Sequence, residues 1–237
     1  MQAIHSSPAK IATPRGGQPR WLKYLIWACY VVIGLSFSGF AWFVIAKPVQ
    51  VVPRSNPAPP FMLRDANGAW LTDGELRGKI VLLQVAYQGC TTECVITTEL
   101  FRELQQRIIA NQAALPIQLI TVGLDGDDPH TLTALQKELA ADGTNWRVLS
   151  ASPESVRELV GGELNIYYAQ RDGATYLRDQ TAVMIDTQGM FRLAYQGNQL
   201  SPDYILRHVE LMQQEVAATG WSRGIYEAAH LFTCYAN

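Results

Sequence analysis

The sequence has little cysteine and little histidine, with 4 residues of each among 237. Small secreted domains held together by disulfides are much richer in cysteine, so a disulfide framework is excluded as the basis of this fold. A glycine-rich phosphate-binding loop and a Ser-His-Asp pattern are also missing. Few residues remain that could carry chemistry, and the cysteines are the first to consider.

Acidic residues are absent from residues 1–46, which contain Lys10, Arg15, Arg20 and Lys23. The rest of the chain carries the other 15 basic residues and all 21 acidic ones, a net charge of −6. Nucleic-acid-binding domains are usually basic. The acidic balance of the larger part therefore argues against a nucleic-acid partner.

Charged residues are absent from residues 24–46, a run of 23 that includes Trp27 and Trp42 near its ends. A membrane-spanning helix needs about 20 apolar residues, and tryptophan concentrates at the membrane interfaces. Positive charges before the span predict a cytoplasmic N-terminus and a domain on the periplasmic or equivalent outer side. A cleaved signal peptide is the alternative, because Val44-Ile45-Ala46 resembles a cleavage site. Its apolar region would be unusually long.

The composition then predicts five segments. They are a basic cytoplasmic tail at 1–23, a single transmembrane anchor at 24–46, a linker with five prolines at 47–60, a folded domain at 61–218 and a C-terminal tail at 219–237. The proline content predicts an extended, stiff linker.

Strand and helix patterns alternate within the predicted domain. Strands are expected from Ile80 to a break at Gly89, at 117–124 and at 146–149, with hairpins turning at Asn67-Gly68 and between 181–185 and 191–195. Helices are expected at 95–110, after Asp128-Pro129, after Ser152-Pro153 and from Pro202 to Ala218. This alternation predicts an α/β sandwich, with a central mixed sheet flanked by helices.

Cys90 and Cys94 follow the buried strand and precede the helix, an arrangement typical of the active-site end of a thioredoxin-like fold. If both lie in the first helical turn, their sulfurs share one face. A helix N-terminus stabilises thiolate, the form that attacks disulfides and binds soft metals. A structural disulfide, a redox dithiol and a copper site all remain open. We expect a reversible disulfide with Cα atoms about 4.4–6.8 Å apart, and Cys90 as the more reactive thiol.

Five short motifs give a more specific indication. They are Asp65-x-x-Gly68, Gly78-Lys79, Cys90-x-x-x-Cys94, Asp127-Asp128-Pro129 and Tyr176-Leu-Arg-Asp179. Together with the anchor, the chain from about 58 to 215 resembles the SCO/SenC family, membrane-anchored thioredoxin-like proteins that help assemble the copper centre of cytochrome c oxidase. The resemblance implies copper between Cys90 and Cys94. It also implies that the partner is the copper-bearing oxidase subunit or another thiol client.

The sequence departs from the family at the third copper ligand. The family carries a histidine in a segment that reads Asp179-Gln180-Thr181 here, and it has prolines where Thr91 and Val95 stand. Two thiolates can hold soft Cu(I), whereas Cu(II) favours imidazole nitrogen, so we expect weakened Cu(II) binding. A metal-independent thiol–disulfide oxidoreductase is the alternative function.

The other candidates are weaker. His230 and Cys234 are spaced i, i+4 and would share a helix face, which makes them alternative metal or redox ligands. His130 and His208 are interpreted as surface or packing residues. Glu93, between the two cysteines, either raises the pKa of a thiol by repulsion or serves as a charge at a helix N-terminus.

Overall fold

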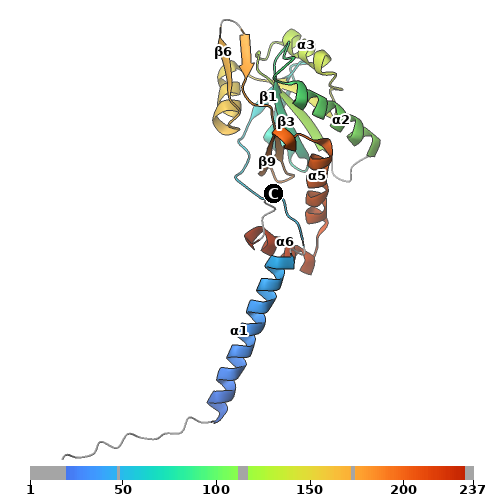
Figure 1. Ribbon diagram of the computed structural model, residues 1–237. Coiled ribbons are helices and arrows are strands. Elements are labelled where there is room, and N and C mark those ends of the chain that lie inside the picture. Colours follow the sequence, from blue (N-terminus) through green and yellow to red (C-terminus); the bar gives the residue numbers. More distant parts are fainter. Residues whose placement is uncertain (1–19, 47–48, 112–116, 172–173, 233–237) are drawn as a thin grey trace, which may run out of the picture. The chain divides into compact units, whose positions relative to one another are not determined.

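The computed structural model describes residues 20–46, 49–111, 117–171 and 174–232 (Figure 1). The chain divides into two compact units, Met1–Pro48 and Val49–Asn237. In the first unit, helix α1 runs over Arg20–Ala46, and its segment Arg20–Trp42 is long and apolar enough to cross a membrane. The predicted span therefore forms a helix, which begins four residues earlier than the uncharged run.

The second unit contains a seven-stranded mixed sheet, a separate two-stranded hairpin and the surrounding helices. Its elements are β1 Met62–Asp65, β2 Trp70–Thr72, η1 Asp73–Leu76, β3 Ile80–Ala86, α2 Val95–Asn111, β4 Ile117–Gly123, α3 Pro129–Leu139, β5 Trp146–Ser150, α4 Pro153–Val156, η2 Arg157–Glu163, β6 Tyr168–Arg171, β7 Ala174–Leu177, β8 Thr181–Ile185, β9 Phe191–Gln196, η3 Gly197–Gln199, α5 Pro202–Ala217 and α6 Trp221–Phe232.

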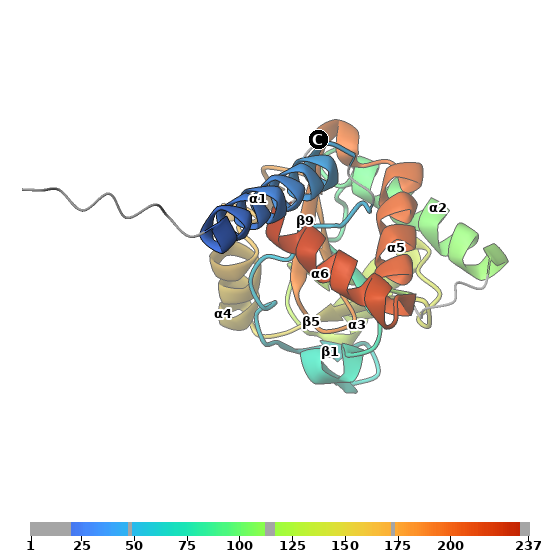
Figure 2. The same cartoon turned by 90° about the horizontal axis from the view of Figure 1, so that it is seen from below.

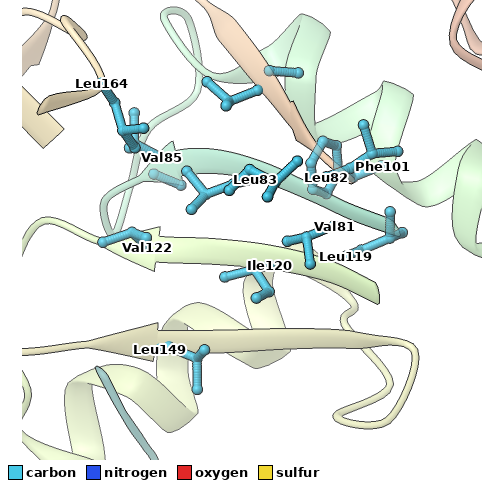
Figure 3. Packing of buried hydrophobic residues seen from close by; sticks show 14 of the residues in the cluster. Val81, Leu82, Leu83, Val85, Phe101, Leu119, Ile120, Val122, Leu149 and Leu164 are labelled. Atoms are coloured by element: carbon cyan, nitrogen blue, oxygen red, sulfur yellow. The ribbon is translucent and has the colours of Figure 1, made fainter. Parts of the chain in front are cut away.

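The sheet has the strand order β2-β1-β5-β4-β3-β8-β9, in which β3, β4 and β5 are parallel and the other pairs are antiparallel. Every residue of β3 and β4 is buried, as expected for parallel strands covered on both faces. Figure 3 shows Leu82 and Leu83 of β3 beside Leu119 and Ile120 of β4. Phe101 of α2 packs near this layer. The predicted α/β sandwich is confirmed.

Side-chain caps explain where several elements begin. The Asp128 carboxylate accepts a hydrogen bond from the Thr131 amide at 3.0 Å, with Pro129 in the first turn of α3. This bond lowers the pKa of Asp128. At the first hairpin, Gly68 adopts φ +81°, a conformation that favours glycine, so the turn forms where Asn67-Gly68 predicted it.

Three features go beyond the sequence predictions. The β6–β7 hairpin had no clear alternating signal, α6 forms in the predicted C-terminal tail, and α4 continues into the π-helical η2. The proline-rich segment packs on the domain instead of standing apart from it. Val52 is fully buried, and the Ser55 amide donates to the Phe191 carbonyl at 3.0 Å.

Because β3, β4 and β5 are parallel, their carboxyl ends meet at one edge of the sheet, here called the carboxyl edge. The β3–α2 loop, the β4–α3 loop and the N-termini of α2 and α3 all lie there. Ile80 and Ile117 begin their strands at the opposite edge. The end of α5 lies at this opposite edge too, since Met212 and Glu215 line a pocket with Ile80. Helix α6 follows α5 in the chain. Figure 2 views the domain from this side.

Candidate thiol site at the carboxyl edge

Carboxylates hold the backbone of the loop that leads from β3 to the cysteines. The Gln88 amide donates to Asp125 Oδ2 at 2.6 Å, and the Gly89 amide donates to both Glu138 carboxylate oxygens at 3.1 and 3.2 Å. Gly89 has φ +76°, which a side chain would strain. The loop is therefore fixed from the β4–α3 loop and from α3, elements distant in sequence.

Cys90 and Cys94 form a disulfide with a Cα–Cα distance of 5.6 Å, within the expected range. Cys94 is buried, with 1% of its surface exposed, whereas Cys90 is partly exposed. An incoming thiolate would reach the Cys90 sulfur more easily. The assignment of Cys90 as the more reactive thiol after reduction remains a prediction.

The two cysteines precede α2, so the condition that both lie in its first turn is not met. The helix begins at Val95, and the Cys94 carbonyl accepts from the Thr98 amide at 2.8 Å and the Thr97 hydroxyl at 3.1 Å. Cys94 thus occupies the N-cap position, and Cys90 lies a full loop before it. The helix-dipole effect fades within one turn, so it acts mainly on Cys94.

Gln180, from the segment between β7 and β8, caps α2. Its Oε1 accepts hydrogen bonds from the amides of Ile96 at 2.8 Å and Thr97 at 3.3 Å. The first amides of a helix have no partner within the helix, and this side chain satisfies two of them. Gln180 therefore lies at the N-terminus of α2, which directly follows Cys94, with its amide oxygen already bonded to backbone. Sequence reasoning missed the capping role, because the contact joins residues more than 80 positions apart.

An open groove adjoins the disulfide loop. It is lined by Thr92, Glu93, Ile96, Arg178, Gln180 and Leu200, among others. Ile96 is exposed, and the side chain of Arg178 is 78% exposed. A polypeptide that approached Cys90 along this groove would meet an apolar side chain and a cation.

Glu93 bonds to the loop that carries the cysteines. The Tyr87 hydroxyl donates to Glu93 Oε2 at 2.9 Å. Together with Asp125 and Glu138, this places three carboxylates around the disulfide loop. Nearby negative charge disfavours thiolate, so these groups oppose the effect of the helix dipole on the reduced form.

Two of the histidines were interpreted from the sequence as surface or packing residues. His208 is buried between β9 and α5, with Nδ1 2.9 Å from the Tyr195 hydroxyl, and burial lowers its pKa. His130 is exposed at the start of α3. Both match their interpretation as packing or surface residues.

His230 is placed by α6 at the opposite edge of the sheet, where its Nε2 lies 3.1 Å from Glu215 Oε1. Its proposed partner, Cys234, lies outside the described residues. Within the ranges that the structure describes, no three His, Cys, Asp or Glu side chains are grouped to hold a metal ion. His230 therefore does not supply a ligand next to the Cys90–Cys94 pair.

A buried ion-pair cluster at the opposite edge was not predicted from the sequence. Arg192 Nε lies 2.7 Å from Asp186 Oδ2, and its Nη2 lies 3.2 Å from Glu215 Oε1. Arg54 pairs with the same Glu215 carboxylate. We call these four side chains the ion-pair cluster. Burial alone would raise the pKa of Glu215, but the charges and hydrogen bonds of the two arginines lower it.

A central mixed sheet, with a cysteine pair between a parallel strand and the helix that follows it, defines a protein of the thioredoxin-like class. Within that class, the sequence profile of the SCO1/SenC family matches residues 51–214, more than half of the chain. The protein belongs to the SCO1/SenC family, as the motifs indicated. A comparison with curated protein sequences gave no match.

Solved structures of family members have the same fold. A SCO1/SenC family lipoprotein from Bacillus anthracis is 19% identical, with a TM-score of 0.58 over 69% of this chain and 98% of that one. BsSco, described as a member of the Sco family of cytochrome c oxidase assembly proteins with a disulfide switch, is 20% identical, with a TM-score of 0.59 over 68% and 96%. Arabidopsis thaliana ScoI with copper bound is 19% identical, with a TM-score of 0.55 over 66% and 98%.

Proposed function

We propose that this protein is a membrane-anchored assembly factor that acts through Cys90 and Cys94 at the copper centre of cytochrome c oxidase. The observation that carries the proposal is the disulfide at the carboxyl edge, with a partly exposed Cys90 in front of a buried Cys94. Two kinds of finding support it: family membership, and the oxidase assembly and copper named for structural relatives.

Thiol reduction at the copper centre is one of the two activities that this geometry supports. In the reduced protein, the Cys90 thiolate attacks a client disulfide, forms a mixed disulfide and releases one client thiolate. Cys94 then attacks the Cys90 sulfur, which forms the Cys90–Cys94 disulfide and releases the second client thiolate. Two electrons pass to the client, whose two thiolates take up the two protons that the cysteines release.

Copper carriage is the other activity that the proposal covers, with the metal as cargo and the reduced protein as carrier. Reduction provides two thiolate sulfurs, which suit Cu(I). Gln180 contributes a neutral amide, and its oxygen already accepts from Ile96 and Thr97. The residues present therefore fit Cu(I) better than Cu(II).

The location follows from the same proposal. Helix α1 spans the membrane, the basic segment before it stays in the cytoplasm and the domain lies on the periplasmic or equivalent outer side. A disulfide persists more readily on that side than in the cytoplasm. A phosphatase fusion after Gln50 checks this topology, and an inactive fusion contradicts it.

The second candidate is a thiol–disulfide oxidoreductase that uses no metal. Gln180 is the residue that bears on this candidate, because its amide oxygen already accepts two backbone hydrogen bonds and its side chain offers no imidazole. Both candidate functions use the Cys90–Cys94 dithiol, and they differ only in whether the protein binds copper.

A copper titration of the reduced full chain in detergent separates them. We expect one Cu(I) per protein, measured by competition with a chromophoric chelator, and loss of binding in Cys90→Ser and Cys94→Ser. Gln180→His should add Cu(II) binding with a thiolate charge-transfer band. Cys29→Ser, in the apolar helix, is the matched control and should bind copper like the parent. A protein that reduces a client disulfide but binds no Cu(I) supports the oxidoreductase alone.

A further inference from the structure

Helix α6 is not used by the proposed thiol chemistry, and its two sides differ. Its domain side contains Ala229, which is buried, and His230, which pairs with Glu215. Trp221 lies nine residues before His230, which is two and a half turns, so it projects from the opposite side. Gly224 and Ala228 follow Trp221 at helical spacings and share its side.

This outer face of α6, formed by Trp221, Gly224 and Ala228, carries no charge. Trp221 is 87% exposed, a high value for a tryptophan in a folded domain. The charged residues of α6 lie away from this face: Glu227 pairs with Arg54. Arg223 lies seven residues before His230, so it shares the domain side, where it lines a pocket with Arg54 and Glu215. An exposed tryptophan on an uncharged helix face is typical of a helix that lies in the membrane interface.

The length of the chain brings a membrane within reach of α6. Val52 belongs to the domain core, and only five residues, 47–51, lie between it and Ala46, the last residue of α1. At most about 3.6 Å per residue gives a tether of about 20 Å. A series of contacts connects Val52 to α6. The Val52 carbonyl accepts a hydrogen bond from Arg192. Arg192 pairs with Glu215, and Glu215 also pairs with His230 of α6. The tether therefore enters the domain on the side where α6 lies.

We infer that α6 docks its outer face on the lipid surface of the membrane that holds the anchor. The occupant is the phospholipid interface, where Trp221 enters the headgroup region. Since α6 and the disulfide loop lie at opposite edges of the sheet, docking turns Cys90 away from the lipid and towards a client that projects from it. The inference rests on the proposed membrane anchor but not on the thiol chemistry.

The test uses the full chain labelled with 5-fluorotryptophan in vesicles of phosphatidylethanolamine and phosphatidylglycerol. A nitroxide on the lipid headgroup should broaden the fluorine resonance of Trp221, which Trp221→Phe assigns. The internal control is Trp70, which is 51% exposed and pairs with Arg64 at the carboxyl edge. We expect severalfold greater broadening at Trp221 than at Trp70.

Ala228→Glu should remove the broadening of Trp221, because it places a charge on the outer face. An unchanged resonance of Trp146, which is in the core, shows that the variant is folded. Ala69→Glu, beside Trp70, is the matched control and should leave Trp221 broadened. Equal broadening at Trp221 and Trp70, or no effect of Ala228→Glu, overturns the inference and leaves the proposed function standing. If the anchor residues Trp27 and Trp42 are not broadened either, the membrane anchor is wrong and the inference falls with it.

Discussion

The two edges of the sheet differ in how exposed their charged side chains are. At the carboxyl edge, exposed carboxylates bond to the backbone of the loop before Cys90, whereas at the opposite edge buried side chains form ion pairs with one another. The amides of Gln88 and Gly89 bond to exposed carboxylates, which water could replace. Arg192 and Asp186 are almost fully buried as an ion pair. Thiol exchange needs a site that can change its bonds, and the exposed edge allows this. The buried edge supplies the fixed support.

Arg192→Ala should have the largest effect, because it leaves Asp186 buried without its cation and removes one of the two arginines that pair with Glu215. Removing one partner of a buried ion pair costs about 3–5 kcal/mol. The free energy of unfolding, from urea denaturation of the full chain in detergent, measures the loss. Arg178→Ala, at the exposed edge, should change it by less than about 0.5 kcal/mol. Similar losses in the two variants would contradict the distinction between the edges.

Two glycines extend the comparison to the backbone. Gly89 has φ +76°, so Gly89→Ala should destabilise the protein by about 1–2 kcal/mol and alter the loop before Cys90. Gly224, in α6, lies in a helix with open space around its Cα, so Gly224→Ala should stabilise by about 0.5–1 kcal/mol. Thermal unfolding of both variants checks the signs. A stabilising Gly89→Ala would show that the loop is not held in this conformation.

Gln180→Ala should destabilise the protein by about 1 kcal/mol, the usual cost of a lost helix cap. The amides of Ile96 and Thr97 lose their acceptor. Gln180→Glu keeps an acceptor there and adds a charge that the helix N-terminus favours, so it should restore stability. Denaturation of both variants, with Cys90 and Cys94 oxidised, is the measurement. If alanine and glutamate behave alike, the cap contributes nothing.

The effect of Glu215 on the pH dependence of the unfolding free energy should be the smallest, since it appears only at acidic pH. The pKa of Glu215 is lowered in the folded protein, so its stabilising contribution is present above its ordinary pKa of 4.5. The contribution is lost as the pH falls through the lowered folded-state pKa. Glu215→Gln should flatten the decline of unfolding free energy in this range. A decline of equal slope in the variant would assign the acid sensitivity to other carboxylates.

The sequence by itself determined the elements whose causes are local. The apolar runs over 80–86 and 117–123 formed buried parallel strands, and Asp128-Pro129 began a helix. Asn67-Gly68 turned a hairpin, and the uncharged run before Ala46 formed a helix. In each case the residues that decide the structure are neighbours in the chain, so their spacing in the sequence was enough to predict the element. The family motifs likewise identified the cysteine pair.

Only the tertiary structure decided how that pair is held. Glu138 reaches Gly89 across 49 positions, and Gln180 reaches Ile96 across 84. No periodicity links such residues, because the folding of the sheet brings them together. The same reason hid the ion-pair cluster, in which Arg192 bonds to the Val52 carbonyl 140 positions away. The local sequence pattern identified Cys90 and Cys94, and packing between distant segments determined which side chains surround them.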